Sequence, residues 1–393
     1  MNADLLSPEE AALQVKDKAE KPLRQICIAV LDGVLNRQEL AALVAEKLAD
    51  LPRWRSVPTR LPVPVWNVDA GFNLSGHVRE FTLEQNEPLE PWLLERLATP
   101  NDADHPAWEL WLGKLPHERS SLLVLLSHPS LGLRRHLMSA LLTNHPGKSS
   151  GAELPPNQVP ENPFEPLAGL GRGLHAAFDS ARSTVLKPKP AKLYIAGVET
   201  DWTQLRSFAQ TFNCTVHDII MTLVAGGLQQ TPAMPKNDAI ALVPLAINAE
   251  GGIAPLGRKI YLPLTDADLL QTLQNVASLT QSHVATGISV AANVLRDIPT
   301  PDQHGQAATT LATGGGHSVY VMNAPGSATD LYCGENRVSK LSAVTTPTQS
   351  LVSVGITRYK QQVSFAASAK IELTGFGRGI MATLASLREV AGS

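Results

Sequence analysis

The sequence predicts an α/β fold made of two related domains, each with a mixed β-sheet and flanking helices. Three observations lead to this prediction. Short apolar segments of strand-like composition alternate with helical segments along the chain. A stretch rich in proline and small polar residues, SSGAELPPNQVPENPFEP, separates two halves of similar size. The second half repeats the alternation of the first, which favours two domains that face each other.

The first domain is predicted over residues 1–145 and begins with a helix. Ser7-Pro8-Glu9-Glu10 has the pattern of a capping box with proline at the first helical position. Further helices are predicted from Asn36 to about Leu48 and from Pro91 to Leu97. The strands predicted in this domain are Gln25 to Leu31, Pro64 to Val68, His77 to Leu83, Trp108 to Lys114 and Ser121 to Leu126.

Residues 146–190 are predicted to be a linker with one helix, Leu167 to Val185, and the second domain covers residues 191–393. Asn323-Ala324-Pro325-Gly326 is predicted to be a turn, because each residue type there is a turn former. The predicted strands are Lys192 to Val198, Ala239 to Ile247, Lys259 to Leu264, Ser318 to Met322, Ser350 to Arg358 and Gln362 to Ala369. The predicted helices are Asp201 to Phe212, Thr215 to about Gln229, Leu269 to Ala285, Val290 to Asp297 and Gly377 to Val390.

Composition narrows the classes of function. A chain of 393 residues that is 44% hydrophobic is large enough for two cores. Its formal net charge of −3 does not match the basic footprint of a nucleic-acid-binding protein. Cys27, Cys214 and Cys333 share no metal-ligand spacing, so we expect no metal site and reduced thiols in a cytoplasmic protein. We see no signal-peptide pattern and no apolar run near the roughly 20 residues of a spanning helix, which leaves peripheral contact with a membrane or lipid droplet open.

His128 is the candidate for chemistry. It follows the apolar run Leu122 to Leu126 and precedes a helix-forming segment, Arg134 to Leu142, so it is predicted to lie on a strand-to-helix turn. A neutral imidazole with a pKa near 6.5 is suited to act as a general base at cytoplasmic pH. A histidine at the end of a strand is also a common structural residue, and the residues alone leave both readings open.

Seven short segments, in this order along nearly the whole chain, carry a family resemblance. In the first half, LSPEEAALQ is similar to LSPxDxxFL, LPRWRSVP to LPRFRxR, DAGFNLSGHVRE to DxxFDxxxHVRR and HPAWELWL to PLWExxL. In the second half, TVHDIIMTLVAGGL is similar to TxNDVVLAxVAGAL, VPLAINAEGG to VPVSVRxEGE and MNAPGS to SNVPGP. Together these segments resemble the bacterial wax ester synthase/diacylglycerol acyltransferase family. This resemblance implies a fold of two chloramphenicol-acetyltransferase-like domains with an active-site cleft or tunnel between them.

The catalytic signature of that family, HHxxxDG, is kept here only in part. Aligned through LLVLLSHPSLGL, its letters fall on Ser127, His128, Gly132 and Leu133, so only the second histidine remains. The family uses that histidine as general base, and its aspartate is thought to brace the loop through a buried ion pair. Gly132 removes this brace and adds backbone freedom, whereas Pro129 biases His128 toward extended geometry.

The resemblance implies an acyl-CoA-dependent O-acyltransferase that joins a fatty acyl group to a long-chain alcohol or diacylglycerol. His128 would be the catalytic base, acyl-CoA a co-substrate, and no bound cofactor is implied. Ser127 is a candidate to hydrogen-bond substrate, and Leu133 would narrow or plug an acceptor channel. Asn323 and Gly326, in the MNAPGS segment, are candidate substrate-binding residues through the resemblance alone.

The changed letters of the motif leave a second class of function open. A catalytically impaired relative would keep the fold and bind acyl chains, a lipid surface or a protein partner. A third reading is a condensation-type relative that takes its acyl chain from a carrier protein.

Overall fold

The computed structural model describes the parts of the chain that form two sheets and the helices around them. The described residues are 4–6, 10, 13–14, 17, 22–59, 65–82, 88–114, 119–132, 137–145, 193–235, 239–244, 257–264, 269–280, 318–347 and 350–392. The predicted helices Leu167 to Val185 and Val290 to Asp297 lie outside these residues. Within the described part, no helix is long and apolar enough to cross a membrane.

The first lobe is built on a six-stranded sheet. Strand β5 runs parallel to β6, and the other neighbours are antiparallel, so the sheet is mixed as predicted. The order is β12 (Tyr332–Cys333), β13 (Asn336–Thr345), β2 (Gln25–Asp32), β7 (Ser120–Ser127), β6 (Trp108–Lys114) and β5 (Val78–Thr82). A separate small sheet has the order β1 (Asp4–Leu5), β4 (Val65–Val68) and β3 (Ser56–Pro58).

Helices cover both faces of the first sheet. Helix α2 (Arg37–Leu48) starts after Asn36, as the sequence predicted, and Asn36 forms a capping box with Glu39. One core lies on the side of α2 and α6 (Leu137–Leu141), and a smaller one lies under α4 (Leu89–Ala98). The remaining short helical elements are η1 (Pro52–Arg55), α3 (Leu74–His77) and α5 (Pro129–Gly132). The centre of β7, Leu122 to Leu126, is buried on both faces, and successive side chains belong alternately to the two cores.

The second lobe has the same kind of architecture. In its sheet β11 runs parallel to both β9 and β14, and the other neighbours are antiparallel. The order is β10 (Gly257–Leu262), β9 (Ala239–Pro244), β11 (Val319–Ser327), β14 (Val352–Tyr359), β15 (Gln362–Ala369) and β8 (Tyr194–Asp201). The helices that cover its outer face are α8 (Trp202–Thr211), α9 (Val216–Gln229), α10 (Leu269–Thr280) and α13 (Phe376–Gly392).

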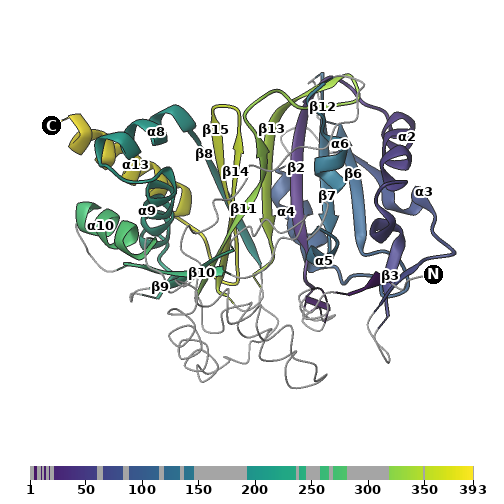
Figure 1. The fold of residues 1–393 in the computed structure, drawn as a ribbon, viewed down its shortest axis with the longest axis horizontal. Coiled ribbons are helices and arrows are strands. Elements are labelled where there is room, and N and C mark those ends of the chain that lie inside the picture. The colour runs from purple at the N-terminus through teal and green to yellow at the C-terminus, as the bar shows by residue number, and fades with distance from the viewer. Residues whose placement is uncertain are drawn as a thin grey trace, which may run out of the picture.

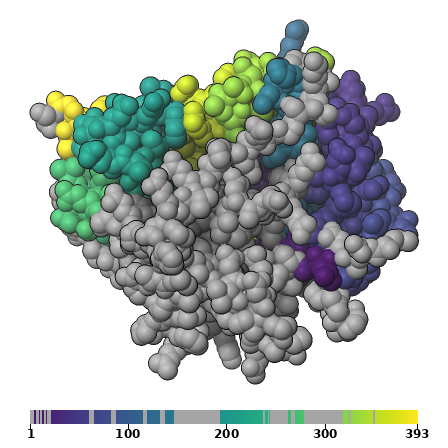
Figure 2. All heavy atoms as spheres, in the orientation of Figure 1, coloured from purple at the N-terminus to yellow at the C-terminus, as the bar shows by residue number. Residues whose placement is uncertain are grey.

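The two sheets face one another in the middle of the molecule, with most helices on the outer sides (Figure 1). Figure 2 shows the same division on the surface, with purple and blue atoms of the first lobe on one side and teal, green and yellow atoms of the second on the other. This arrangement confirms the predicted α/β class with two mixed sheets. The boundaries of the predicted domains and linker remain a prediction, because residues 146–192 lie outside the described part.

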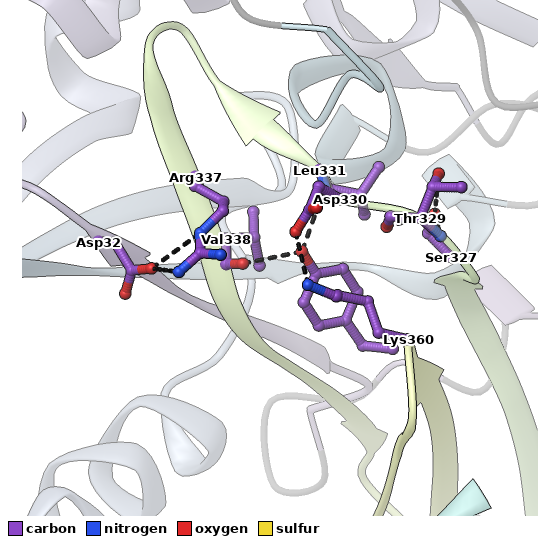
Figure 3. Close-up of polar contacts among 9 residues, drawn as sticks. Asp32, Ser327, Thr329, Asp330, Leu331, Arg337, Val338 and Lys360 are labelled. Carbon is purple, nitrogen blue, oxygen red and sulfur yellow. Dashed lines mark hydrogen bonds and ion pairs between the residues drawn. The ribbon is translucent and has the colours of Figure 1, made fainter. Parts of the chain in front are cut away.

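One segment departs from a simple division of the chain at the linker. Strands β12 and β13 come from the C-terminal half and complete the first sheet, where β13 pairs with β2. The sequence prediction missed both strands. The Tyr359 hydroxyl fixes this excursion, because it accepts from the Leu331 N–H (3.1 Å) and donates to the Val338 carbonyl (2.8 Å). Figure 3 labels Leu331 and Val338 together with the charged residues beside them. Two ion pairs flank the excursion, Lys360 with Asp330 (2.8 Å) and Arg337 with Asp32 (2.6 Å).

The predicted turn at Asn323-Ala324-Pro325-Gly326 is wrong. Strand β11 continues through these residues to Ser327, with an irregular register against β14 between Ala324 and Ser327. Proline and glycine are tolerated there because an irregular ladder leaves residues unpaired.

Candidate active site

His128 lies on the predicted strand-to-helix turn, at the end of a central strand. Ser127, the last residue of β7, pairs with Gln25 of β2 and Trp108 of β6. The His128 N–H then donates to the Ala107 carbonyl (2.8 Å), which holds the turn against the neighbouring chain. Pro129 opens the short helix α5, so the backbone of His128 is fixed on both sides.

The Nδ1 atom of His128 has several close polar neighbours. The Ser130 hydroxyl lies 2.7 Å away, the Ser130 backbone N–H donates at 3.3 Å, and the Gln14 amide nitrogen lies at 3.3 Å. Gln14 also donates to the Ser130 hydroxyl oxygen (2.9 Å). The imidazole is therefore held in one orientation by its own loop and by the N-terminal segment.

Burial controls the charge of the ring. His128 is 1% exposed, and desolvation lowers the pKa of its ring to about 4. The Asp17 carboxylate and a hydrogen bond with the Leu13 backbone act in the opposite direction and raise this pKa. The nearby Arg24 guanidinium lowers the pKa further. His128 is consequently neutral at pH 7, as a general base must be, but its lowered pKa makes it a weaker base than the pKa near 6.5 expected from the sequence.

The Nε2 atom of His128 is buried and has no hydrogen-bond partner among the described residues. A buried polar atom without a partner is costly, and such atoms gather at functional sites. His128 also contributes to the wall of a cavity of about 480 Å³. The other described residues that line this cavity are Gln14, Asp17, Pro58, Trp66, Pro100, Asn101, Asp102, Ala103, His105, Ala107 and Leu131.

All the described residues around this cavity come from the first lobe. Its wall includes apolar groups such as Trp66 and Leu131 and ionisable groups such as Asp17, Asp102 and His105. A passage between the two lobes, which the resemblance implies, remains a prediction for this chain.

The N-terminal segment supplies a second wall of the site. Glu10, Gln14 and Asp17 are spaced by four and three residues, and the Asp17 N–H donates to the Leu13 carbonyl (3.2 Å), so they share one helical face. Glu10 is buried in an ion pair with Arg53 and accepts from the Trp66 indole N–H (3.3 Å).

Asp17 fixes the other end of this segment. Its carboxylate accepts from the Leu23 N–H (2.7 Å) and from the Asn101 side-chain amide (2.9 Å). Gln14 is therefore held between two anchored carboxylates. Gln14, Asp17 and Ser130 were not predicted as site residues, although Glu10, Gln14 and Asp17 form a polar stripe on the predicted first helix that is visible in the sequence.

The other predicted site residues are not gathered around His128. Ser127 is buried with no partner for its hydroxyl in the described part, and it is absent from the described cavity lining. Leu133 lies outside the described residues. Asn323 in β11 pairs through its backbone with Ile356 of β14, and Gly326 lies exposed near the end of β11.

The strand register separates Gly326 from His128. Thr345 of β13 pairs with Gln25, opposite Ser127, so His128 lies at this end of the sheet. Ser327 pairs with Tyr359, whose hydroxyl reaches Val338 near the other end of β13. Val338 and Thr345 are seven residue steps apart along the strand, a span of roughly 20 Å. A direct role for Gly326 beside the imidazole is therefore not supported by this geometry.

His77 has a structural role. Its ring stacks between Phe72 (centroids 5.0 Å apart) and Trp108 (4.5 Å), and its Nδ1 lies 2.8 Å from the Trp108 carbonyl. Burial lowers the pKa of His77. Trp108 itself is 3% exposed and its indole N–H donates to the Trp54 carbonyl (2.7 Å), so it is a core residue.

Solved structures share the fold of this chain. The wax ester synthase/diacylglycerol acyltransferase from Marinobacter aquaeolei VT8 superposes with a TM-score of 0.70 at 18% identity, over 99% of this chain and 100% of that one. The first condensation domain of the calcium-dependent antibiotic synthetase gives 0.64 at 13% identity, over 99% and 96%. These likenesses confirm the predicted fold of two chloramphenicol-acetyltransferase-like domains.

Sequence relatives narrow the class further. Two proteins from Mycobacterium tuberculosis strains, named provisionally as diacylglycerol O-acyltransferases, are each 24% identical over 348 residues, which cover 73% of this chain and 74% of theirs. No protein-family model matches the chain. The resemblance to the wax ester synthase/diacylglycerol acyltransferase proteins, predicted from the sequence, is thus confirmed both in sequence and in fold.

Proposed function

We propose that this protein is an acyl-CoA-dependent O-acyltransferase that forms wax esters or triacylglycerol from a long-chain alcohol or diacylglycerol. The observation that carries the proposal is the Nε2 atom of His128. It is buried without a partner, on a neutral ring that belongs to the wall of a cavity. The related proteins, named for the same chemistry, support it.

The reaction needs one proton to move twice. In the base-competent form of His128, Nε2 takes the proton of the acceptor hydroxyl while the oxygen attacks the thioester carbonyl. The tetrahedral intermediate then expels the CoA thiolate, and the imidazolium returns the proton to this leaving group. A base of this kind contributes about 10²- to 10⁴-fold to the rate.

The loop is braced without the aspartate of the family motif. Gly132 stands at that position, and the ring is instead held through Ser130 and Gln14. Gln14 is positioned by the buried Glu10–Arg53 ion pair on the preceding turn of its helical segment. We assign the bracing of the loop to this N-terminal segment.

The partners follow from the same proposal. A starter condensation domain of similar fold (TM-score 0.58, 12% identity, 100% of this chain and 95% of that one) is described in complex with C8-CoA. Acyl-CoA is accordingly the donor that we assign to this chain, and a lipid alcohol is the acceptor. The protein would work in the cytoplasm, at the surface of the membrane or of lipid inclusions where such acceptors are found.

Purified protein tests the proposal directly. Palmitoyl-CoA is mixed with hexadecanol or dioleoylglycerol, CoA release is followed with a thiol reagent, and the ester product is identified by mass spectrometry. We expect CoA release that depends on the acceptor, with one ester formed for each CoA released. Release that does not depend on acceptor, or no release above background, would contradict the proposal.

One specific observation favours a second candidate function. In this function the protein is a catalytically impaired relative that binds lipid or a protein partner. The groups around Nδ1 are arranged as donors, which places the ring proton on Nε2 and leaves no lone pair there. Binding of palmitoyl-CoA or of lipid vesicles without ester formation in the same assay is the result that this candidate predicts.

A further inference from the structure

The hydrogen bonds around His128 determine which ring nitrogen carries the proton. A neutral imidazole has one N–H and one lone pair, and its neighbours decide where each lies. The backbone N–H of Ser130 can only donate, and it points to Nδ1 at 3.3 Å. The amide nitrogen of Gln14 also can only donate, and it faces Nδ1 at 3.3 Å and the Ser130 hydroxyl oxygen at 2.9 Å.

The contacts to Nδ1 favour one arrangement of the ring proton, and the Leu13 backbone also hydrogen-bonds the ring and raises its pKa. Because the Ser130 oxygen accepts from Gln14, its own hydrogen is free to donate to Nδ1 at 2.7 Å. Three donors then converge on Nδ1, so Nδ1 holds the lone pair and the proton lies on Nε2. In this tautomer Nε2 carries the proton and cannot accept the proton of an alcohol.

The same three side chains support the opposite direction of hydrogen bonding. If the Gln14 amide turns so that its oxygen faces Ser130, the hydroxyl donates to this oxygen and accepts from a protonated Nδ1. The lone pair then lies on Nε2, which is the base-competent form. The exchange removes two donors from Nδ1, the Ser130 backbone N–H (3.3 Å) and the Gln14 amide nitrogen (3.3 Å).

We propose that Gln14 and Ser130 are positioning residues that set the tautomer of His128, with the resting form protonated on Nε2 and the base-competent form reached when the Gln14 amide reverses. The consequence for catalysis rests on the proposed function, but the tautomer itself does not. The family segment that LSPEEAALQ resembles has leucine at the position of Gln14, so the setting of the His128 tautomer by this amide is specific to the present chain. Charged groups near the ring are Asp17 and Arg24.

Two substitutions separate this role from a merely structural one. Gln14→Glu places a carboxylate, which accepts only, against the Ser130 hydroxyl and so favours protonation of Nδ1. Ser130→Ala removes the hydroxyl that Nδ1–H needs as acceptor and so favours protonation of Nε2. The two changes are expected to move the tautomer, and with it the turnover, in opposite directions.

The tautomer is measured by ¹⁵N NMR on histidine-labelled full-length protein at pH 7, with the His128 signals assigned by their loss in His128→Gln. We expect wild type and Ser130→Ala to show a non-protonated Nδ1 and a protonated Nε2, and Gln14→Glu to shift toward a protonated Nδ1. Gln271→Glu, on the exposed face of α10, is the matched control and should leave the His128 signals unchanged.

Turnover supplies the second readout. If the base-competent form is about a tenth of the wild-type population, Gln14→Glu raises kcat by up to about tenfold, and Ser130→Ala lowers it at least as much. A protonated Nδ1 in wild type, or unchanged nitrogen signals in folded Gln14→Glu, would overturn the proposal. An inactive wild type with the expected signals would remove the acyltransferase function and support the positioning roles.

Discussion

At the scale of single residues, the chemistry of this protein depends on a histidine kept away from water. His128 is almost completely buried, and its pKa is lowered to about 4, chiefly by desolvation. The ring is therefore neutral at pH 7. Its lowered pKa also has a consequence for stability, because the unfolded chain binds a proton that the folded chain does not.

We predict that His128 destabilises the folded protein as pH falls from 6.5 to 4. The unfolded ring is protonated below its usual pKa of about 6.5, whereas the folded ring stays neutral until about pH 4. Each pKa unit is worth about 1.4 kcal/mol, so this residue takes about 3 kcal/mol from the free energy of unfolding by pH 4. Urea unfolding of wild type and His128→Gln at pH 7 and pH 4.5 measures the difference.

His105 provides the control for this measurement. It is exposed, pairs with Asp69 at 3.1 Å, and its pKa is raised mainly by the hydrogen bond to that carboxylate. The ion pair of His105 stabilises the folded protein below the usual histidine pKa, and this stabilisation is lost as pH rises through the raised pKa. His105→Gln should therefore change the dependence of the free energy of unfolding on pH in the direction opposite to that of His128→Gln. Equal pH slopes in wild type and His128→Gln would contradict a buried, neutral His128.

At the scale of secondary-structure elements, the contact between β13 and β14 connects the two sheets. A Cβ atom on Gly355 of β14 would overlap the carbonyl oxygen of Ala343 in β13. The glycine is needed for close approach of two backbones and not for an unusual φ angle. The face of β14 that carries Gly355 also carries Tyr359, which fixes Leu331 and Val338.

Gly355→Ala is expected to destabilise the protein by about 3 kcal/mol, since neither backbone can move without disturbing its own sheet. Gly76→Ala is the matched control: a Cβ there meets no atom within 4 Å, and we expect a change below about 1 kcal/mol. Urea denaturation measures both. Similar free energies of unfolding for the two variants would show that the two strands are not in tight contact.

Sequence reasoning identified most elements but missed β13 for a physical reason. Its sequence, NRVSKLSAVT, does not alternate with a period of two, because a register shift lies between Val338 and Lys340. The starts of the helices at Asn36 and Thr215 were predicted correctly because helix starts depend on local sequence patterns. The turn expected at Asn323–Gly326 failed because pairing with β14 overrides the local preference for a turn.

At the scale of the whole molecule, the C-terminal half of the chain contributes strands to the sheets of both lobes. The C-terminal half of the chain sends β12 and β13 into the first sheet and then returns to the second sheet through β14 (Figure 1). Unfolding of either lobe would therefore expose β13 and remove support from the other. We expect the lobes to unfold together.

Tryptophan positions allow a test of this expectation. Trp202 is the single tryptophan of the C-terminal half, and the others lie between residues 54 and 111. In Trp202→Phe, fluorescence reports the first lobe while far-UV circular dichroism reports both. We predict one urea midpoint for the two signals, within error. Two separated transitions would show that the lobes are independent.

The resemblance found in the sequence gave the fold class and the position of His128, because order and spacing of motifs survive where single motif letters change. It did not give the surroundings of the ring. Gln14 and Ser130 occupy positions that the family motifs leave variable or apolar, so only the three-dimensional structure brings them to Nδ1. The buried state of the ring is also a property of tertiary packing.

The rate of ester formation in His128→Ala, compared with His105→Ala, tests the central claim most directly. Both histidines line the same cavity, but only His128 has a buried nitrogen without a partner. With palmitoyl-CoA and hexadecanol, we predict that His128→Ala lowers kcat about 10²- to 10⁴-fold while circular dichroism shows a folded protein, and that His105→Ala stays within about threefold of wild type. Ester formation at the wild-type rate in folded His128→Ala would contradict the claim that this imidazole takes the proton of the acceptor.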